Sequence, residues 1–148
     1  MKNYIFYLLL IVSVVSCKNG VKQNKEDADQ GDTTKVVAKV NVYDQEKDSL
    51  YHAKTDIQFL KALQYFVKNN DKEVISSVIN YPIHTIPNKE FFFKHYDSIF
   101  NTAVKDSLQV ANLDSLFRNY QGTMVGNGQI WVNEVDTIPT WKIIAINY

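Results

Sequence analysis

The strongest constraint on the fold of this chain is a hairpin pattern near the C-terminus. Residues 120–125 and 129–134 have the composition of strands and flank the sequence Gly126-Asn127-Gly128. Asn-Gly between two such segments is typical of a type I′ turn, in which both turn residues take positive φ. That turn sets Met124 opposite Trp131, so the pattern predicts an antiparallel pair of strands.

Upstream of the hairpin, apolar residues recur at helical spacing. Thr55 and Gln58 fit a capping box, which begins a helix by pairing side chains with free backbone N–H groups. The apolar face of that helix consists of Ile57, Leu60, Leu63 and Val67, with Phe59 and Phe66 beside them. Asn70 with Glu73 predicts the start of a second helix, so a helical hairpin is expected.

A short strand and a third helix are predicted next. Tyr81-Pro82 ends the second helix, because the residue before a proline avoids helical backbone angles. Residues 83–86 are predicted as a short strand, and Asn88 as the cap of the third helix. That helix carries Phe91, Phe92, Tyr96, Ile99 and Phe100. Residues 102–110 and 112–118 are predicted as short helical turns.

The order of these elements predicts the α+β class. With a final strand over residues 141–148, the order is a helical hairpin, a short strand, a third helix and three antiparallel strands. A curved antiparallel sheet packed on helices accommodates that order. Further upstream, apolar and polar residues alternate over residues 36–43, so an edge strand or docked arm is expected within residues 35–54.

The first residues have the features of a cleaved signal peptide. Met1-Lys2-Asn3 is short and positively charged, and residues 4–15 are apolar except for Ser13. A transmembrane helix needs about 20 apolar residues, so this run is too short to be a good permanent span. Its length suits the hydrophobic part of a signal peptide.

The signal ends in Val14-Val15-Ser16-Cys17, which resembles a bacterial lipobox, and Cys17 is the only cysteine in the chain. The resemblance implies a lipoprotein signal peptide over residues 1–16 and a lipid on Cys17 that anchors the mature protein to a bacterial membrane. An ordinary cleaved signal or an uncleaved anchor is the alternative. Lipidation uses the sole thiol, so the domain must fold without a disulfide.

Residues 17–34 are predicted to form a flexible tether, because they contain too few apolar residues to pack a core. The acidic cluster at residues 26–29 follows Lys18-Asn19-Gly20-Val21. This order departs from the acidic tag that directs some lipoproteins to the cell surface, and favours a periplasm-facing protein in the cell envelope. The chain has 16 basic and 16 acidic residues, and cleavage removes Lys2, so the mature net charge is near −1. No nucleic-acid partner is expected.

Three segments within residues 55–148 carry a family resemblance. They are Tyr81-Pro82, residues 95–100 (HYDSIF) and residues 119–131 (NYQGTMVGNGQIW). They resemble segments of small uncharacterised exported bacterial proteins with the NTF2-like, or cystatin-like, cone fold. The resemblance implies a domain in which a curved sheet wraps around helices. It implies no particular activity, because this fold hosts enzymes, binding modules and dimerisation domains.

The sequence predicts no catalytic residue, metal or cofactor. The histidines, His52, His84 and His95, lack the spacing of a zinc site, and the chain has no CxxC pair. The enzymatic alternative, implied by the cone fold, is an acid–base pocket in which burial tunes a pKa. Its residues would be His95, Tyr96, Asp97, Tyr120 and Trp131.

A ligand pocket is predicted between the third helix and the sheet. Tyr96, Tyr120 and Trp131 would form its walls, and Arg118 at its rim would hold a carboxylate. The competing interpretation places the rings in a filled core, and Arg118 at a helix end where it satisfies the last carbonyls.

Both faces of the terminal sheet look apolar. Met124 and Trp131 lie on one face, and Val125, Ile130 and Val132 on the other, with Val125 opposite Ile130. One face packs on the helices, and the second needs a cover because large apolar patches are uncommon on monomers. Residues 36–43, a second copy in a homodimer or another protein would provide it.

Taken together, the sequence predicts a lipid-anchored, non-enzymatic binding module of the cell envelope whose ligand is unknown. The first alternative is an interaction protein, such as an inhibitor or immunity protein of an envelope hydrolase. The second is a small acid–base enzyme. If the rings of the predicted pocket fill the core instead, the second apolar sheet face becomes the better site, and the interaction protein is then favoured.

Overall fold

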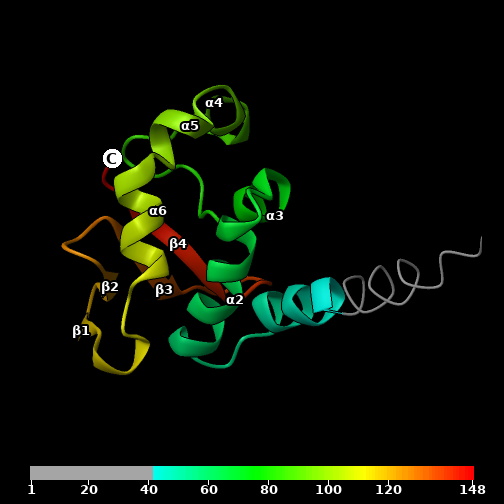
Figure 1. Ribbon diagram of the computed structural model, residues 1–148, viewed down its shortest axis with the longest axis vertical. Helices are drawn as coiled ribbons and strands as arrows, with labels where there is room; N and C mark the ends of the chain where they lie inside the picture. Colours follow the sequence, from blue (N-terminus) through cyan, green and yellow to red (C-terminus); the bar gives the residue numbers. More distant parts are fainter. Residues whose placement is uncertain (1–41) are drawn as a thin grey trace, which may run out of the picture.

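The computed structural model describes residues 42–148 and has the α+β architecture expected from the sequence (Figure 1). Residues 42–51 are helical. The remaining helices are α2 (Asp56–Lys68), α3 (Lys72–Ser77), α4 (Lys89–Lys94), α5 (Tyr96–Ile99), α6 (Thr102–Gln109) and the 3₁₀ turn η1 (Leu113–Ser115). The strands are β1 (Phe117–Asn119), β2 (Gly122–Val125), β3 (Ile130–Glu134) and β4 (Trp141–Ile146), which form one antiparallel sheet in that order.

The cap of α2 is the one predicted from the sequence. The Gln58 N–H donates to Thr55 Oγ1 over 3.2 Å, which satisfies one free donor of the first turn. The reciprocal bond differs from a standard capping box. Gln58 Oε1 accepts from the Lys54 N–H over 2.8 Å, one residue before the cap.

The start of α3 was predicted one residue too early. Asp71, not Asn70, is the cap, and its Oδ1 accepts from the Val74 N–H over 3.0 Å. Asn70 instead has φ 52° and ends the connection from α2. A capping residue usually has a non-helical backbone with negative φ, as Asp71 does (φ −77°, ψ 84°), whereas Asn70 is left-handed. Asparagine is one of the few residues that adopts this conformation at small cost.

The region between α3 and α6 differs from the prediction in two respects. Ile83 and Ile86 form an isolated bridge with backbone bonds of 3.1 and 2.9 Å in both directions, so the predicted strand is a tight turn that pairs with itself. Asn88 caps the next helix as predicted, with a bond of 2.8 Å to Phe91. That helix breaks at His95 (φ −114°, ψ 16°) and is therefore two short helices, α4 and α5.

The hairpin between β2 and β3 has the predicted register but a different turn. Met124 faces Trp131 across the two strands, as expected. Residues 126–129 form the turn, in which Gly126 has φ 63° and Gly128 has φ 94°. The predicted positive φ at Asn127 is wrong: Asn70 is the one non-glycine residue of the described chain with positive φ. The two glycines adopt it without a Cβ penalty, and Gln129 Oε1 accepts from the Asn127 N–H over 2.6 Å.

A fourth strand precedes this hairpin and was missed in the sequence. Residues 112–118, predicted as helical turns, contain η1 and then begin β1. β1 pairs with β2 across the two-residue turn Tyr120-Gln121, with Asn119 opposite Gly122. A strand of three residues is too short to show a period of two, which explains the error. β4, in turn, ends at Ile146 rather than at residue 148.

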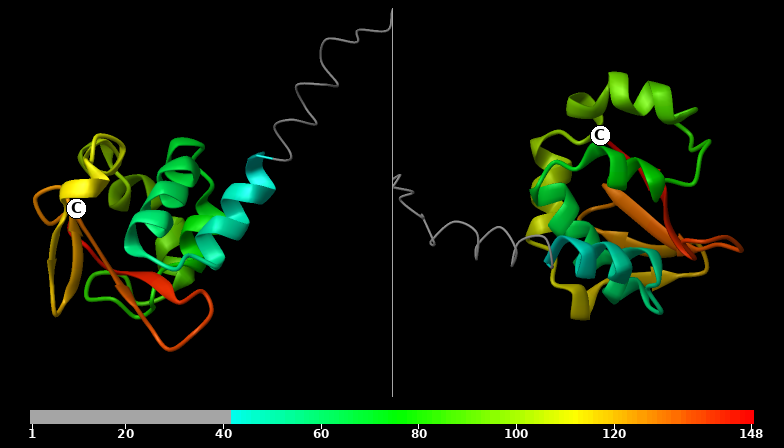
Figure 2. Two further views of the ribbon diagram at one scale, coloured as in Figure 1. Left: turned by 90° about the horizontal axis from the view of Figure 1, so that it is seen from below. Right: turned by 90° about the vertical axis from the view of Figure 1, so that its right-hand side faces the viewer.

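The sheet packs its inner face on the helices (Figures 1 and 2). Val125, Ile130, Val132 and Ile143 point to that face and are fully buried, as the alternation in β2 and β3 predicts. The free edge of β4 is partly paired, because Ile143 exchanges backbone hydrogen bonds with Val78 (2.8 Å) and Asn80 (2.9 Å). One apolar face is therefore buried by the fold itself.

The edge strand predicted over residues 36–43 is wrong for the part that the structure describes. Val42 and Tyr43 are helical, and residues 36–41 lie outside the described chain. Tyr43 and Leu50 are seven residues apart on one helical face. Leu50 is fully buried, and the Tyr43 ring packs edge-on against Phe66 with centroids 5.6 Å apart. The helical residues 42–51 therefore pack on α2 and α3, not on the outer face of the sheet.

Candidate binding surface

The predicted lipidation site, Cys17, and the lipobox lie outside residues 42–148. Within residues 42–148, no helix is long and apolar enough to cross a membrane.

Tyr96 belongs to the core rather than to a pocket wall. It is 1% exposed, stacks on Phe100 with centroids 5.6 Å apart and planes at 10°, and meets Phe92 edge-on at 5.5 Å. These are packing geometries that aromatic pairs favour. The ring therefore fills space between α4, α5 and the core.

The structure does not bring the other three predicted pocket residues to Tyr96. Tyr120 is 91% exposed at the tip of the turn between β1 and β2. Trp131 lies on the opposite face of the sheet from the core and packs edge-on against Phe117, with centroids 6.4 Å apart. Because Tyr96 is inside the core and Trp131 outside it, the four residues do not line one cleft.

Arg118 ties the sheet to the start of α2. Its Nε donates to Asp56 Oδ2 over 2.6 Å, and Thr123 Oγ1 donates to the same oxygen over 2.7 Å. The Ile57 N–H donates to the other carboxylate oxygen over 2.8 Å. The remaining Arg118 nitrogens reach the carbonyls of Leu113 and Leu116 at 3.5 and 3.3 Å, which resembles the competing role predicted for this arginine.

The Asp56 carboxyl is held in its charged form. Burial alone raises its pKa, but the hydrogen bonds from Arg118 and Thr123, and the charge of Arg118, outweigh burial and hold the pKa below its usual value. Asp56 was not identified in the sequence, although its place as the first residue of α2 is where an acidic side chain is favoured. Arg118 and Thr123 both donate hydrogen bonds to Asp56, so this cluster is structural.

The outer face of the sheet carries a row of apolar side chains across all its strands. Phe117 pairs with Met124, Met124 with Trp131, and Trp131 with Ala145. We call Phe117, Met124, Trp131 and Ala145 the outer row. Phe117 is 54% exposed and the other three are partly buried. No helix of residues 42–148 covers this face (Figure 2).

The surroundings of the outer row are polar but poor in charge. Asn119 and Asn133 share its face by register, and Lys142 pairs with Asn133. Tyr120, at the end of the same hairpin, adds an exposed aromatic ring. An apolar centre with a polar rim is the anatomy of a protein–protein contact.

A hollow of about 460 Å³ lies between the helical residues 42–51 and α2. Its lining is mostly polar and includes Glu46, His52, Lys54 and Lys61. His52 Nε2 and Asp48 Oδ1 are 3.7 Å apart, but their side chains are 63% and 78% exposed. Water screens a pair that is this exposed. Within residues 42–148, no group of three or more His, Cys, Asp or Glu side chains is placed to hold a metal.

No protein-family description, curated protein or solved structure matches this chain.

Proposed function

We propose that the protein is a lipid-anchored protein of the bacterial cell envelope that binds another envelope protein through the outer row. The single observation that carries this proposal is the alignment of Phe117, Met124 and Trp131 on a sheet face that no described helix covers. The aromatic residues and methionine are enriched in the centres of protein interfaces. Trp and Tyr also supply a large share of binding energy when a partner buries them.

A protein partner fits this face better than a small molecule does. Small ligands need a concave site that surrounds most of their surface. The outer row is instead a cross-strand surface, and the aromatic residues expected to enclose a ligand are divided between the core (Tyr96) and the surface (Tyr120, Trp131). The interaction protein therefore becomes the favoured function over the small-molecule module.

The role we propose involves no chemistry by the protein itself. Both oxygens of the buried Asp56 carboxylate already accept hydrogen bonds, from Arg118, Thr123 and the backbone. The exposed pair Asp48 and His52 is solvated. These observations favour binding over acid–base catalysis.

We further propose that the domain is a variant of the NTF2-like cone fold. Two features support this assignment. The chain order is helices, a short turn that pairs with itself at Ile83 and Ile86, more helices and a final antiparallel sheet. In addition, Ile79 forms a parallel bridge to Ile143 in the last strand, which extends the sheet beyond β4.

The partner is tested by photo-crosslinking in the native host. A photoreactive phenylalanine analogue at position 117 should yield a discrete adduct with one envelope protein, and the same analogue at Ile138, which is 80% exposed in the loop between β3 and β4, should not. Phe117→Ser should abolish co-purification of that partner, while Ile138→Ser retains it. A self-adduct at position 117, with loss of a dimer in Phe117→Ser, would instead assign this face to a second copy. Equal adducts from both positions would refute the proposal.

The lipid anchor has its own test. Cys17→Ser should remove incorporation of a palmitate analogue and leave the protein unanchored or uncleaved, because no other cysteine can accept the lipid. Label that persists on the Cys17→Ser variant would contradict the anchor.

A further inference from the structure

The Tyr96 hydroxyl is a buried polar group without a partner. The residue is 1% exposed, and its hydroxyl has no hydrogen bond. Leaving a buried donor unsatisfied costs free energy, so native proteins rarely retain one without a reason. Burial, followed by the charges of Asp97 and Asp71, raises the pKa of Tyr96 to about 12, so the phenol stays neutral and able to donate.

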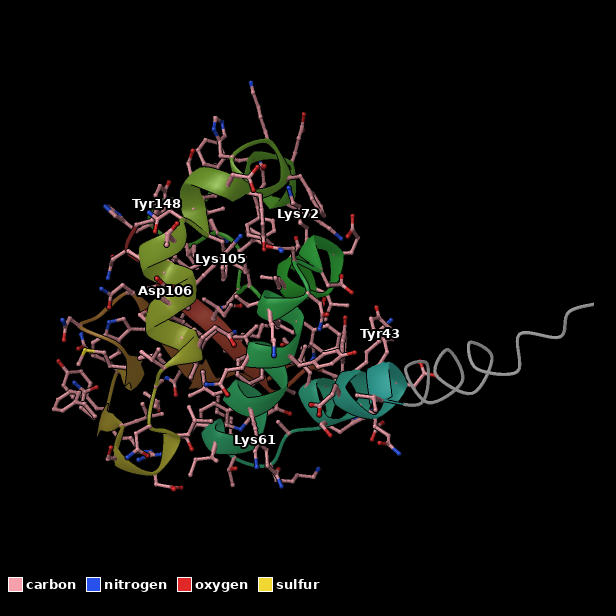
Figure 3. All side chains as sticks on the ribbon, viewed as in Figure 1. Tyr43, Lys61, Lys72, Lys105, Asp106 and Tyr148 are labelled. Carbon is pink, nitrogen blue, oxygen red and sulfur yellow. The ribbon has the colours of Figure 1, made fainter. Side chains whose placement is uncertain are left out.

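Two ammonium groups converge on the same ring. Lys72 Nζ lies 4.4 Å from the ring centroid and Lys105 Nζ lies 5.3 Å from it. Lys72 comes from the first turn of α3 and Lys105 from α6, so separate elements bring the two charges together (Figure 3). Each cation gains from the ring, but two cations at one ring also repel each other.

Two carboxylates, Asp71 and Asp97, lie near the Tyr96 ring, but neither forms an ion pair with Lys105. Lys72 Nζ is 3.7 Å from Asp97 Oδ1, but the Asp97 side chain is 86% exposed, and water weakens such a pair. Asp71 is committed elsewhere, because its oxygens accept from the Val74 N–H (3.0 Å) and the Tyr43 hydroxyl (2.9 Å). Neither carboxylate accepts a hydrogen bond from Lys105 or from the Tyr96 hydroxyl.

Lys105 has only a neutral partner among the described residues. Its Nζ donates to Asn70 Oδ1 over 2.7 Å, and no described carboxylate forms an ion pair with it. Asn70 has a left-handed backbone conformation with φ 52°, which costs a non-glycine residue some free energy. The amide oxygen thus occupies the position at which an anionic oxygen would interact more strongly.

We propose that Lys72, Lys105 and the Tyr96 hydroxyl form a binding site for a phosphate group. Three donors from three helices can meet three oxygens of a tetrahedral oxyanion, and two of them carry the charge that such a group requires. The ligand satisfies the orphan hydroxyl and relieves the repulsion between the ammonium groups. This site is independent of the outer row.

The test is a titration of the full-length protein with inorganic phosphate. Phosphate should raise the melting temperature in a saturable way, compared with potassium chloride at the same ionic strength, because a ligand that binds the folded state stabilises it. Lys105→Gln and Lys72→Gln should each weaken binding by about tenfold or more, the effect of losing one charge-assisted hydrogen bond. Lys61→Gln, which makes the same charge change on the exposed face of α2, should bind as wild type does (Figure 3).

Tyr96→Phe separates binding from folding. This variant loses only a hydroxyl that has no partner, so it should melt at or above the wild-type temperature without phosphate yet bind phosphate more weakly. A parallel titration with glycerol 3-phosphate identifies the source of the group: tighter binding than inorganic phosphate indicates a lipid headgroup, and weaker binding a free ion. Non-saturable stabilisation, or equal losses in Lys61→Gln and Lys105→Gln, would overturn the proposal.

Discussion

Replacing Arg118 with methionine isolates the ion pair that joins β1 to α2. The substitution keeps an aliphatic stem and leaves the Asp56 carboxylate with the Thr123 hydroxyl and the Ile57 N–H. Breaking a fully buried pair costs about 3–5 kcal/mol, whereas a surface pair contributes about 0–1 kcal/mol. The Asp56 side chain is 11% exposed and that of Arg118 41%, so the pair lies between these limits. We expect Arg118→Met to lower the free energy of unfolding by about 1–3 kcal/mol at pH 7.

The stabilisation by the Arg118–Asp56 pair should depend on pH. Asp56 has a lowered pKa in the folded protein, so its contribution is present above the usual value of 3.8 and is lost as the pH falls through the lowered pKa. Without Arg118, only the hydrogen bonds from Thr123 and Ile57 oppose burial, so we expect the pKa of the same carboxyl to rise. Protonation then removes the unpaired negative charge of Asp56 in the variant. The difference in the free energy of unfolding between wild type and Arg118→Met should therefore shrink as the pH falls below about 4.

Urea unfolding, followed by tryptophan fluorescence, measures both effects, and a double-mutant cycle with Asp56→Asn checks the coupling. Removing both charges should cost less than the sum of the two single changes, because no unpaired carboxylate remains buried. Two results would refute the reasoning: an Arg118→Met variant as stable as wild type at pH 7, or a double variant whose loss equals that sum.

Two further predictions concern the backbone and the tyrosines. A Cβ at Gly122 (φ +134°) would lie 2.3 Å from the Val132 carbonyl oxygen, whereas one at Gly128 (φ +94°) would find its nearest neighbours at 3.8 Å. In urea unfolding, Gly128→Ala should therefore cost about 1–2 kcal/mol from backbone strain alone, and Gly122→Ala clearly more; equal losses would contradict the clash. Tyr43 and Tyr96 both have their pKa raised from 10 to about 12, so the stability they confer should be intact below pH 10 and lost between pH 10 and 12. Melting at stepped alkaline pH, with tyrosinate absorbance recorded in parallel, checks this, and a melting temperature that stays constant across that interval would contradict it.

The parts of the fold that the sequence predicts well depend on neighbouring residues. Thr55 and Asn88 cap their helices as expected, because the accepting oxygen and the donating N–H are three residues apart in each case. The register of Met124 and Trp131 is also local, since the intervening turn sets it. Even the error at Asn127 leaves that register unchanged, because Gly126 and Gly128 supply the positive φ on either side.

The parts that were missed depend on contacts between distant residues. Tyr43 is helical in the folded protein, where its ring contacts Phe66 and its hydroxyl donates to Asp71. Neither partner lies near it in the sequence. In the same way, Lys72 and Lys105 meet at Tyr96 only because α3 and α6 pack beside α5. The alternation of polarity that ends at Val42 and Tyr43 is a local pattern, and at these two residues tertiary contacts override it.

The ion pair of Arg118 also explains why the outer row is exposed. Neighbouring residues of a strand point to opposite faces, so Arg118 facing Asp56 on α2 requires Phe117 to face away from the helices. A slip of one residue in β1 would bury Phe117, but it would also separate Arg118 from Asp56 and leave the buried carboxylate unpaired. Arg118 therefore both stabilises the sheet and determines that the outer row lies on the face away from the helices. The sequence places Met124 and Trp131 on one face of the sheet, but adding Phe117 to that face requires recognising that Asp56 and Arg118, 62 residues apart, are partners.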